Sequence, residues 1–185
     1  MIPEFLEWTK IARLSREIVI TEKIDGTNGV IYVPEDPAEK IIAGSRSRWL
    51  TSDVPDNHGF ARWVAENSAE LRGLSPGYHY GEWWGKGIGK RYSQHAPDHK
   101  QFALFNVSRW GEERPACCSV VPVLDRGLFR TDLVDGAISR LRETGSVACP
   151  GCMRPEGVVI FHTASGYLFK KTLEKDESHK SEASS

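Results

Sequence analysis

A lysine followed by an acidic residue and a glycine is the feature of this sequence that most directly suggests chemistry. Lys23 ends an apolar stretch, and Asp25-Gly26 turns the chain immediately afterwards. A lysine amine is a nucleophile only when burial or neighbouring cations lower its pKa toward neutrality. The same residues also fit an ordinary strand-turn-strand, because Asp-Gly turns are common. The local sequence leaves both interpretations open.

Five further segments, in a fixed order along the chain, favour the catalytic interpretation. They are Gly44-Ser45-Arg46-Ser47-Arg48, Tyr80-Gly81-Glu82-Trp83-Trp84-Gly85, Phe102-Ala103-Leu104-Phe105-Asn106-Val107, Pro155-Glu156-Gly157-Val158-Val159-Ile160 and Leu168-Phe169-Lys170-Lys171-Thr172. Together with Lys23-x-Asp25-Gly26-x-Asn28, they resemble motifs I, Ia, III, the aromatic motif that follows it, IV and V of the covalent nucleotidyltransferases. That superfamily comprises ATP-dependent DNA ligases, RNA ligases and mRNA capping enzymes. The resemblance covers nearly the whole chain.

Asn28 narrows the resemblance to the RNA ligase 2 type, because DNA ligases and capping enzymes usually place Arg at this position of motif I. The resemblance implies a minimal ATP-dependent RNA ligase that uses Mg²⁺ or Mn²⁺ and joins RNA with 5′-phosphate and 3′-OH ends. Asn28 itself would serve the steps after the lysine is charged. Two alternatives remain: a DNA ligase or capping-type core, and a catalytically inactive nucleic-acid-binding module.

The resemblance also implies how the nucleotide is held. Lys23 would attack the α-phosphate of ATP, release pyrophosphate and carry AMP. Glu82 would accept hydrogen bonds from the ribose hydroxyls, and Phe105 would stack on adenine. Glu22, which precedes the lysine, is placed with these nucleotide-binding residues. An exposed strand glutamate and a core phenylalanine are the structural alternatives for Glu82 and Phe105.

Other charged residues are assigned to phosphate and metal. Arg46 or Arg48 would bind the AMP phosphate or the RNA 5′-phosphate, since a guanidinium grips phosphate with two parallel hydrogen bonds. Glu156 would help to hold the divalent ion, largely through water. Asp25 is the second candidate for the metal, with a turn-stabilising role as the alternative.

Basic residues cluster between the third motif and the aromatic motif. Lys90 and Arg91 lie in the densest basic stretch and are candidates for contact with RNA, although charge runs are usually solvated loops.

Motif V departs from its usual form. It normally carries Lys-x-Lys, with both lysines on one face of a strand. Here Lys170 and Lys171 are adjacent, so on a regular strand they point to opposite faces and Thr172 takes the second position. We expect Lys170 to contact the phosphate and stabilise charge in the transition state. Lys171 would need a bulge to join it at the nucleotide.

The elements that must position these residues are mostly short strands. Period-2 alternation and β-branched residues predict strands at 17–22, 29–33, 40–45, 78–83, 101–107, 119–124, 157–162 and 167–173, and helical spacing predicts helices at 59–71 and 133–143. Strand runs with only two helices indicate an α+β fold rich in antiparallel sheet. The resemblance makes this an ATP-grasp-like ligase adenylylation domain over residues 1–173, followed by a polar tail at 174–185.

Composition sets the outer limits. The 185 residues include 24 Lys+Arg and 25 Asp+Glu, with a net charge of -1, which argues against a surface coated in basic residues but allows a basic cleft. No run of 18 apolar residues and no secretory signal are present, so no membrane association and a cytoplasmic location are expected. The four cysteines are expected to be reduced thiols, and Cys149-Pro150-Gly151-Cys152 is interpreted as a turn rather than half of a zinc site. Because little chain follows motif V, a partner protein for RNA engagement is a possibility. The sequence does not predict the oligomeric state.

Overall fold

Two β-sheets carry the fold in the computed structural model, which describes residues 2–51, 55–92, 98–174 and 176. The four-stranded sheet has the order β7-β1-β8-β9 and is antiparallel throughout. Its strands are β1 (Glu17–Lys23), β7 (Val123–Leu128), β8 (Gly157–His162) and β9 (Tyr167–Thr172). The five-stranded sheet has the order β3-β2-β4-β5-β6, and only its β5–β6 pair is parallel. Its strands are β2 (Thr27–Val33), β3 (Ile42–Gly44), β4 (Gly77–Trp84), β5 (Gln101–Leu104) and β6 (Cys118–Val120).

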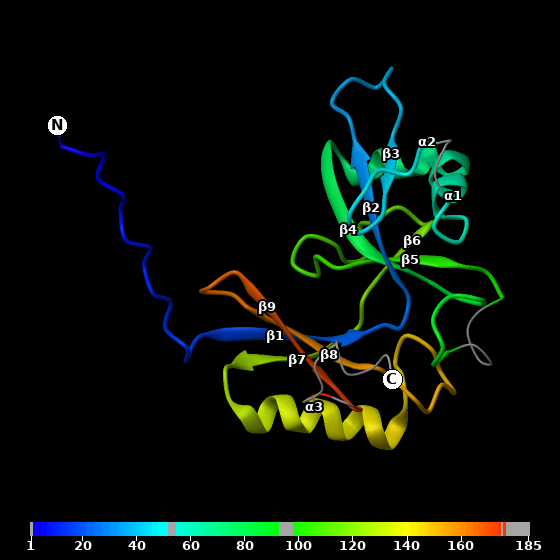
Figure 1. Cartoon of the computed structure of the whole chain (residues 1–185). Coiled ribbons are helices and arrows are strands. Elements are labelled where there is room, and N and C mark those ends of the chain that lie inside the picture. The colour runs from blue at the N-terminus through cyan, green and yellow to red at the C-terminus, as the bar shows by residue number, and fades with distance from the viewer. Residues whose placement is uncertain (1, 52–54, 93–97, 175, 177–185) are drawn as a thin grey trace, which may run out of the picture.

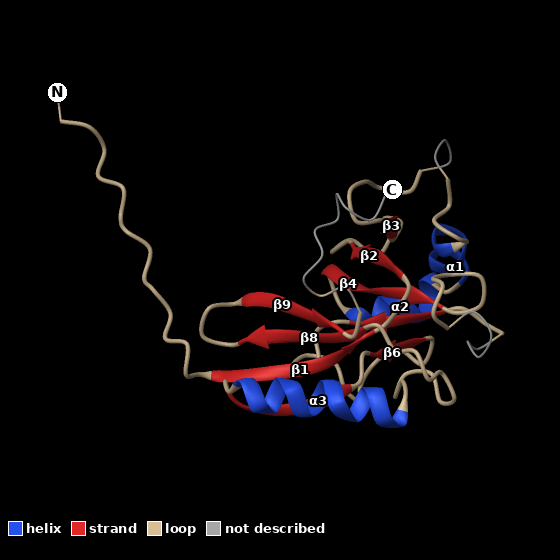
Figure 2. Cartoon of the chain, turned by 60° about the horizontal axis from the view of Figure 1, so that its bottom comes forward, coloured by secondary structure: helices blue, strands red, loops and turns tan. Residues whose placement is uncertain are grey.

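Each sheet buries one face under its own helices (Figure 1). Helix α3 (Thr131–Thr144) lies along the four-stranded sheet, where Ala137 and Leu141 pack with Ile18 and Ile20 of β1 (Figure 2). The five-stranded sheet packs against α1 (Phe60–Glu66), α2 (Ser68–Leu71) and a short 3-10 turn (Arg72–Leu74). Alternation along each strand therefore leaves the opposite faces of both sheets for other contacts.

The chain passes between the two sheets at two places that matter for the site. It leaves β1 after Lys23 and enters β2 at Thr27, and it later leaves β6 and enters β7 across Val121-Pro122. Near these crossings, a third buried cluster forms from Ile24, Trp84, Tyr92, Ala103, Val121, Cys149 and Cys152. The residues of the first motif thus lie where the two sheets meet.

The predicted elements are present, but the strands predicted at 40–45 and 101–107 are shorter, at Ile42–Gly44 and Gln101–Leu104, and two other predictions are corrected. The strand predicted at 119–124 is two strands in different sheets, because Pro122 has no N–H to continue a ladder. The helix predicted at 59–71 is broken at Asn67, whose backbone lies at φ -101°, ψ 14° and whose Nδ2 donates to the Trp63 carbonyl at 2.8 Å. A short polar side chain that bonds back to the preceding turn competes with helix continuation.

Three observations concern the ends and the cysteines. Residues 2–13 extend away from both sheets, whereas the carbonyls of Leu14 and Arg16 hydrogen-bond to His162 and Phe129 (Figures 1 and 2). Of the predicted tail at 174–185, only Glu174 and Asp176 lie within the described residues. Cys149 and Cys152 form a disulfide, which corrects the expectation of reduced thiols at these two positions, while Cys117 and Cys118 are free thiols.

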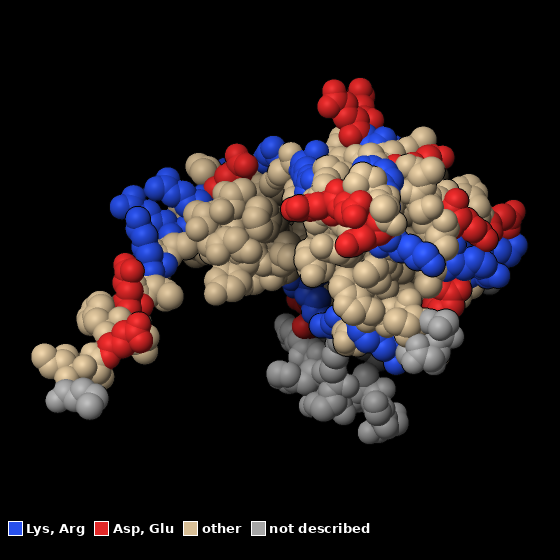
Figure 3. Space-filling model, turned by 90° about the horizontal axis from the view of Figure 1, so that it is seen from above, with Lys and Arg blue, Asp and Glu red and all other residues tan. Residues whose placement is uncertain are grey.

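The surface is mixed in charge, and the helices are short. On the face seen in Figure 3, Lys and Arg side chains are interspersed with Asp and Glu. No helix in the described part of the chain has both the length and the apolar character that a membrane span requires.

Candidate active site

Lys23 lies at the point where the chain leaves the four-stranded sheet. On β1, Ile18 and Ile20 face α3, so Thr21 and Lys23 project from the other face. The Lys23 Nζ donates to Glu156 Oε2 at 2.7 Å, and the two side chains are 25% and 22% exposed. Glu156 immediately precedes β8, whose Gly157 pairs with Lys23. Strand pairing therefore brings together two residues separated by 133 positions in the chain.

Glu82 reaches the same place from the five-stranded sheet. It pairs with Asn28 across β4 and β2, and the Asn28 Nδ2 donates to Glu82 Oε2 at 3.3 Å. Burial is the main reason that the pKa of Glu82 is raised to about 7. The positive charge of Lys23 opposes this rise, and the negative charge of Glu156 contributes to it. The backbone of Gly26 acts in the opposite direction and lowers the pKa of Glu82. A carboxyl group with this pKa changes charge near neutral pH.

The site combines a partly buried ammonium with an excess of carboxyl groups. Lys23 faces Glu156 directly, and Glu82 and Asp25 lie close enough to affect the local potential. Such a site favours a cation. Within residues 2–51, 55–92, 98–174 and 176, no three His, Cys, Asp or Glu side chains converge as a ready metal-ligand set. One or two carboxylates completed by substrate phosphates and water are the ordinary environment of Mg²⁺, so Glu156 fits such an ion.

The adjacent lysines of β9 point to opposite sides. Lys170 pairs with Val159 and, through β8, shares the face of Thr21 and Lys23. Lys171 donates to Asp135 Oδ1 of α3 at 2.6 Å. The β8–β9 register has no bulge, so Thr172 follows Lys170 on the site face. The prediction that Lys171 binds the nucleotide is therefore corrected: α3 holds it on the far face of the sheet.

Asp25 anchors a loop. Its Oδ2 accepts hydrogen bonds from the backbone N–H groups of Lys90 and Arg91 at 2.8 and 2.7 Å. The Arg91 side chain continues to Glu174, with 3.2 Å between Nη2 and Oε2, and its Nη1 is buried without a hydrogen-bond partner. Asp25 thus holds the distant 90–91 backbone, which places Lys90 and Arg91 beside the first motif.

Glu22 is buried and fully engaged. Its Oε1 accepts hydrogen bonds from the hydroxyls of Tyr92 and Ser146, and its Oε2 accepts from the N–H groups of Val147 and Ala148 at 2.8 and 2.9 Å. The side chain is 1% exposed. The prediction that Glu22 binds the nucleotide is therefore corrected, because its carboxylate has no free lone pair directed at the site. It ties β1 to the segment after α3.

The remaining predicted residues lie along one face of the five-stranded sheet. Phe105 follows β5 and is 40% exposed, and its N–H donates to the Tyr80 carbonyl at 3.0 Å. Since Ala103 pairs with Glu82, Phe105 lies on the face of Glu82. Arg46 and Arg48 are exposed in the turn after β3, which is closed by a 2.8 Å bond from the Ser45 N–H to the Arg48 carbonyl. The structure places both arginines in the same turn and does not separate their roles.

Asn57 is a positioning residue that sequence reasoning missed. Its Oδ1 accepts from the Thr27 hydroxyl at 3.3 Å, and its Nδ2 donates to the Asn28 carbonyl at 3.4 Å. It adopts φ 46°, in the left-handed region that asparagine tolerates better than most residues. In the sequence, the only indication of a special backbone conformation here is the Asn57-His58-Gly59 run before a helix.

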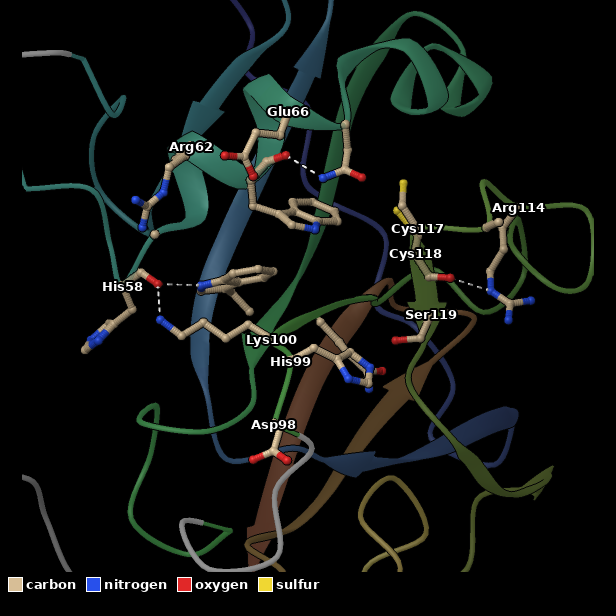
Figure 4. A pocket seen from close by; sticks show the side chains of 16 residues that line it. His58, Arg62, Glu66, Asp98, His99, Lys100, Arg114, Cys117, Cys118 and Ser119 are labelled. Carbon is tan, nitrogen blue, oxygen red and sulfur yellow. Dashed lines mark hydrogen bonds between the residues drawn. The ribbon is translucent and has the colours of Figure 1, made fainter.

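A pocket of about 770 Å³ lies on the other side of the five-stranded sheet (Figure 4). It is lined by Arg62 of α1, Lys100 and Arg114, among others, and contains none of the predicted site residues. Trp83 lines it, and because neighbours on a strand face opposite ways, Glu82 points away from it. The volume of the pocket is therefore no guide to the chemistry of Lys23.

A family model described as RNA ligase matches residues 16–173. The chain belongs to the RNA ligase family. The matched range holds every predicted site residue, from Glu22 to Lys171. No curated protein matches the sequence.

Solved structures of another RNA ligase share the fold. Naegleria gruberi RNA ligase, as a variant with AMP and Mn, is 20% identical at a TM-score of 0.61 over 97% of this chain and 60% of that chain. The same enzyme with PPi is 18% identical at a TM-score of 0.57, over 96% of this chain and 60% of that chain. An apo variant is 18% identical at a TM-score of 0.58, over 91% of this chain and 56% of that chain. The chain thus spans somewhat more than half the length of these proteins, and the mixed α+β fold with antiparallel-rich sheets is that of RNA ligases.

Proposed function

We propose that this RNA ligase family member is an ATP-dependent RNA ligase that acts through a covalent lysyl-AMP at Lys23. The observation that carries the proposal is the 2.7 Å pair of Lys23 with Glu156, beside the buried Glu82, at the junction of the two sheets. Membership of the family and the motif order support it.

In the first step, the Lys23 Nζ would form a P–N bond to the α-phosphorus of ATP while the bond from that phosphorus to the pyrophosphate oxygen breaks. The amine must first lose a proton, and the Glu156 carboxylate at 2.7 Å lies where it can accept one. Lys170, on the same sheet face, would stabilise the negative charge that builds up on the phosphate. In the free protein Lys23 is paired with the Glu156 carboxylate, so its amine reaches the α-phosphorus only once that pairing is relieved.

Glu156 would hold Mg²⁺ or Mn²⁺ together with nucleotide phosphates and water. When bound, the ion supplies positive charge at the carboxylates and phosphates. Structures of Naegleria gruberi RNA ligase are described with ATP and Mn and with AMP and Mn, which supports the same requirement here.

Glu82 would accept hydrogen bonds from the ribose hydroxyls, and Phe105 would stack on the adenine. Both lie on one face of the five-stranded sheet. Asn28, which donates to Glu82, is placed to act when AMP passes to the 5′-phosphate of RNA and the 3′-OH attacks. Arg46 or Arg48 would grip one of these phosphates.

The test is transfer of label from α-³²P-ATP to the protein in the presence of Mg²⁺. Wild type and Lys40→Ala, a control at an exposed lysine between β2 and β3, should form an acid-labile adduct that pyrophosphate discharges. Lys23→Ala should form none. Labelling by GTP but not ATP would favour a capping-type enzyme. RNA binding without label from either nucleotide would favour the inactive binding module.

A further inference from the structure

Four aromatic side chains cover the exposed part of the five-stranded sheet, on the face that carries Glu82. We call Tyr32, Trp49, Tyr78 and Tyr80 the aromatic face. Tyr80 and Tyr78 precede Glu82 by two and four residues on β4, so all three side chains share one side of the sheet. Tyr78 pairs with Tyr32 of β2, and Trp49 bridges to Gly44 beside β2.

The rings form a continuous platform. The Tyr78 and Tyr80 rings are 6.3 Å apart at 12° between planes, and the Tyr78 and Trp49 rings are 6.2 Å apart at 27°. Tyr32 contacts Tyr78 with 4.9 Å between centroids. Tyr78 and Tyr80 are each 55% exposed and Trp49 is 41% exposed, whereas Trp83 on the opposite face is 2% exposed. A cluster of exposed aromatic rings on a folded domain marks a binding surface.

The aromatic face continues directly from the candidate active site. A strand rises about 3.3 Å per residue, so Tyr80 and Tyr78 lie roughly 7 and 13 Å from Glu82 along β4. Phe105, the candidate adenine platform, donates its N–H to the Tyr80 carbonyl. Two exposed arginines, Arg46 and Arg48, border the patch in the turn that leads to Trp49. This turn follows Gly44, which lies level with Tyr80 across β2. Aromatic rings flanked by guanidinium groups match bases flanked by phosphates.

We propose that the aromatic face binds unpaired nucleotides of the RNA substrate by base stacking, one or two nucleotides from the end being joined. The proposal rests on the proposed function for the identity of the substrate. Bases within a duplex already stack on one another and present only their edges, whereas unpaired bases offer their faces to aromatic side chains. The structure thus assigns this ligase a preference for RNA whose ends are single-stranded.

The test compares two 5′-phosphorylated, 3′-fluorescein RNAs of equal length by fluorescence anisotropy, one unstructured and one a blunt hairpin. Tyr78→Ala and Tyr80→Ala should each weaken binding of the unstructured RNA at least fivefold, and binding of the hairpin less than twofold, since stacking on one ring contributes that much per base. Tyr78→Phe and Tyr80→Phe should bind as wild type. Tyr167→Ala, at a tyrosine 69% exposed on β9 of the other sheet, is the matched control and should change nothing.

Several outcomes would overturn the proposal. One is that wild type and both alanine variants bind the unstructured RNA equally well. A second is that the alanine substitutions weaken binding of the hairpin as much as binding of the unstructured RNA. A third is that wild type binds neither RNA. A change of the alanine variants from dimer to monomer in sedimentation would assign the patch to a second copy of the chain. Label from α-³²P-ATP, measured on the same proteins, keeps the two proposals distinct. Unlabelled wild type with intact tyrosine dependence would remove the ligase function and leave the RNA-binding surface.

Discussion

The protonation of Glu82 couples the site to the stability of the fold. Its pKa is raised to about 7, whereas the same carboxyl group titrates near 4.5 in an unfolded chain. Between these values the folded state holds a proton that the unfolded state has lost, so stability falls as pH rises through this window. The full cost, on the order of 3 kcal/mol, is present above pH 7.

Replacing Glu82 by glutamine should remove that cost. Glu82→Gln is expected to unfold at the same urea concentration as wild type at pH 4 and at a clearly higher one at pH 8. Glu66→Gln, at an exposed glutamate of α1, serves as the control and should follow wild type at both pH values. Parallel curves for Glu82→Gln and wild type from pH 4 to pH 8 would show that Glu82 titrates normally. The same substitution should prevent labelling by ATP if the ionised carboxylate holds the ribose.

The two lysines of β9 provide a paired test of orientation. Lys170→Ala is expected to slow label transfer from ATP about 100-fold, the size of effect seen when one group that stabilises developing charge is removed. Lys171→Ala removes only an exposed ion pair with Asp135, which contributes about 0 to 1 kcal/mol. It should retain nearly full activity. If both variants lost the same fraction of the labelling rate in single-turnover measurements, Lys171 would also reach the nucleotide.

The sequence predicted some of these residue-level features and not others. Alternation on a strand is a local property, so the opposite orientations of Lys170 and Lys171 follow from adjacency alone. The role of Glu22 does not, because its partners are Tyr92 and the segment 146–148, more than 60 residues away. The bonds of Asp25 to the 90–91 backbone could not be predicted either, because they join residues 65 and 66 positions apart.

At the scale of elements, Glu22 joins three segments that the sheets alone leave unconnected. Its carboxylate receives two hydroxyls and two backbone N–H groups, which link β1, the loop at Tyr92 and the segment after α3. Leaving a buried hydrogen-bond donor without its acceptor costs about 1 to 3 kcal/mol. This network fixes the strand that carries Lys23.

Glu22→Gln should therefore destabilise the protein. An amide nitrogen cannot accept a hydrogen bond, so the substitution leaves at least one donor facing a donor in a buried site. We expect a loss of about 2 kcal/mol in urea unfolding at pH 7. Glu17→Gln, at the exposed start of the same strand, is the control. An unchanged midpoint for Glu22→Gln would mean that the 146–148 segment is held by other contacts.

The elements themselves were largely predictable because their signals are local. Strands β1, β2, β4, β8 and β9 and helix α3 carry clear periodicity. The change of sheet at Pro122 and the break at Asn67 were missed, since hydrophobic period does not show which sheet a strand joins or where a helix bends. The disulfide between Cys149 and Cys152 was also missed, because compartment arguments favour reduced thiols whatever the local geometry.

At the scale of the whole molecule, the site exists only because two separately packed sheets meet. Lys23, Glu156 and Lys170 come from the four-stranded sheet, whereas Asn28, Glu82 and Phe105 come from the five-stranded sheet. Each sheet has its own helices and its own buried cluster. The sequence implied this arrangement only through the family resemblance, because pairings such as Lys23 with Gly157 join distant parts of the chain.

Gly26 sets how closely the two sheets approach. A Cβ atom at this position would lie 2.5 Å from the Trp83 carbonyl oxygen and 2.9 Å from Glu82 Cγ, so the crossing between β1 and β2 fits against β4 only without a side chain. Gly26→Ala should push the first motif away from Glu82, lower stability by about 1 to 3 kcal/mol through overpacking and abolish label transfer from ATP. Gly111→Ala, where a Cβ meets nothing within 4 Å, is the matched control and should behave as wild type in both measurements. A labelled Gly26→Ala protein of normal stability would mean that the contact between the sheets is loose, and that Lys23 and Glu82 need not be held together for the first chemical step.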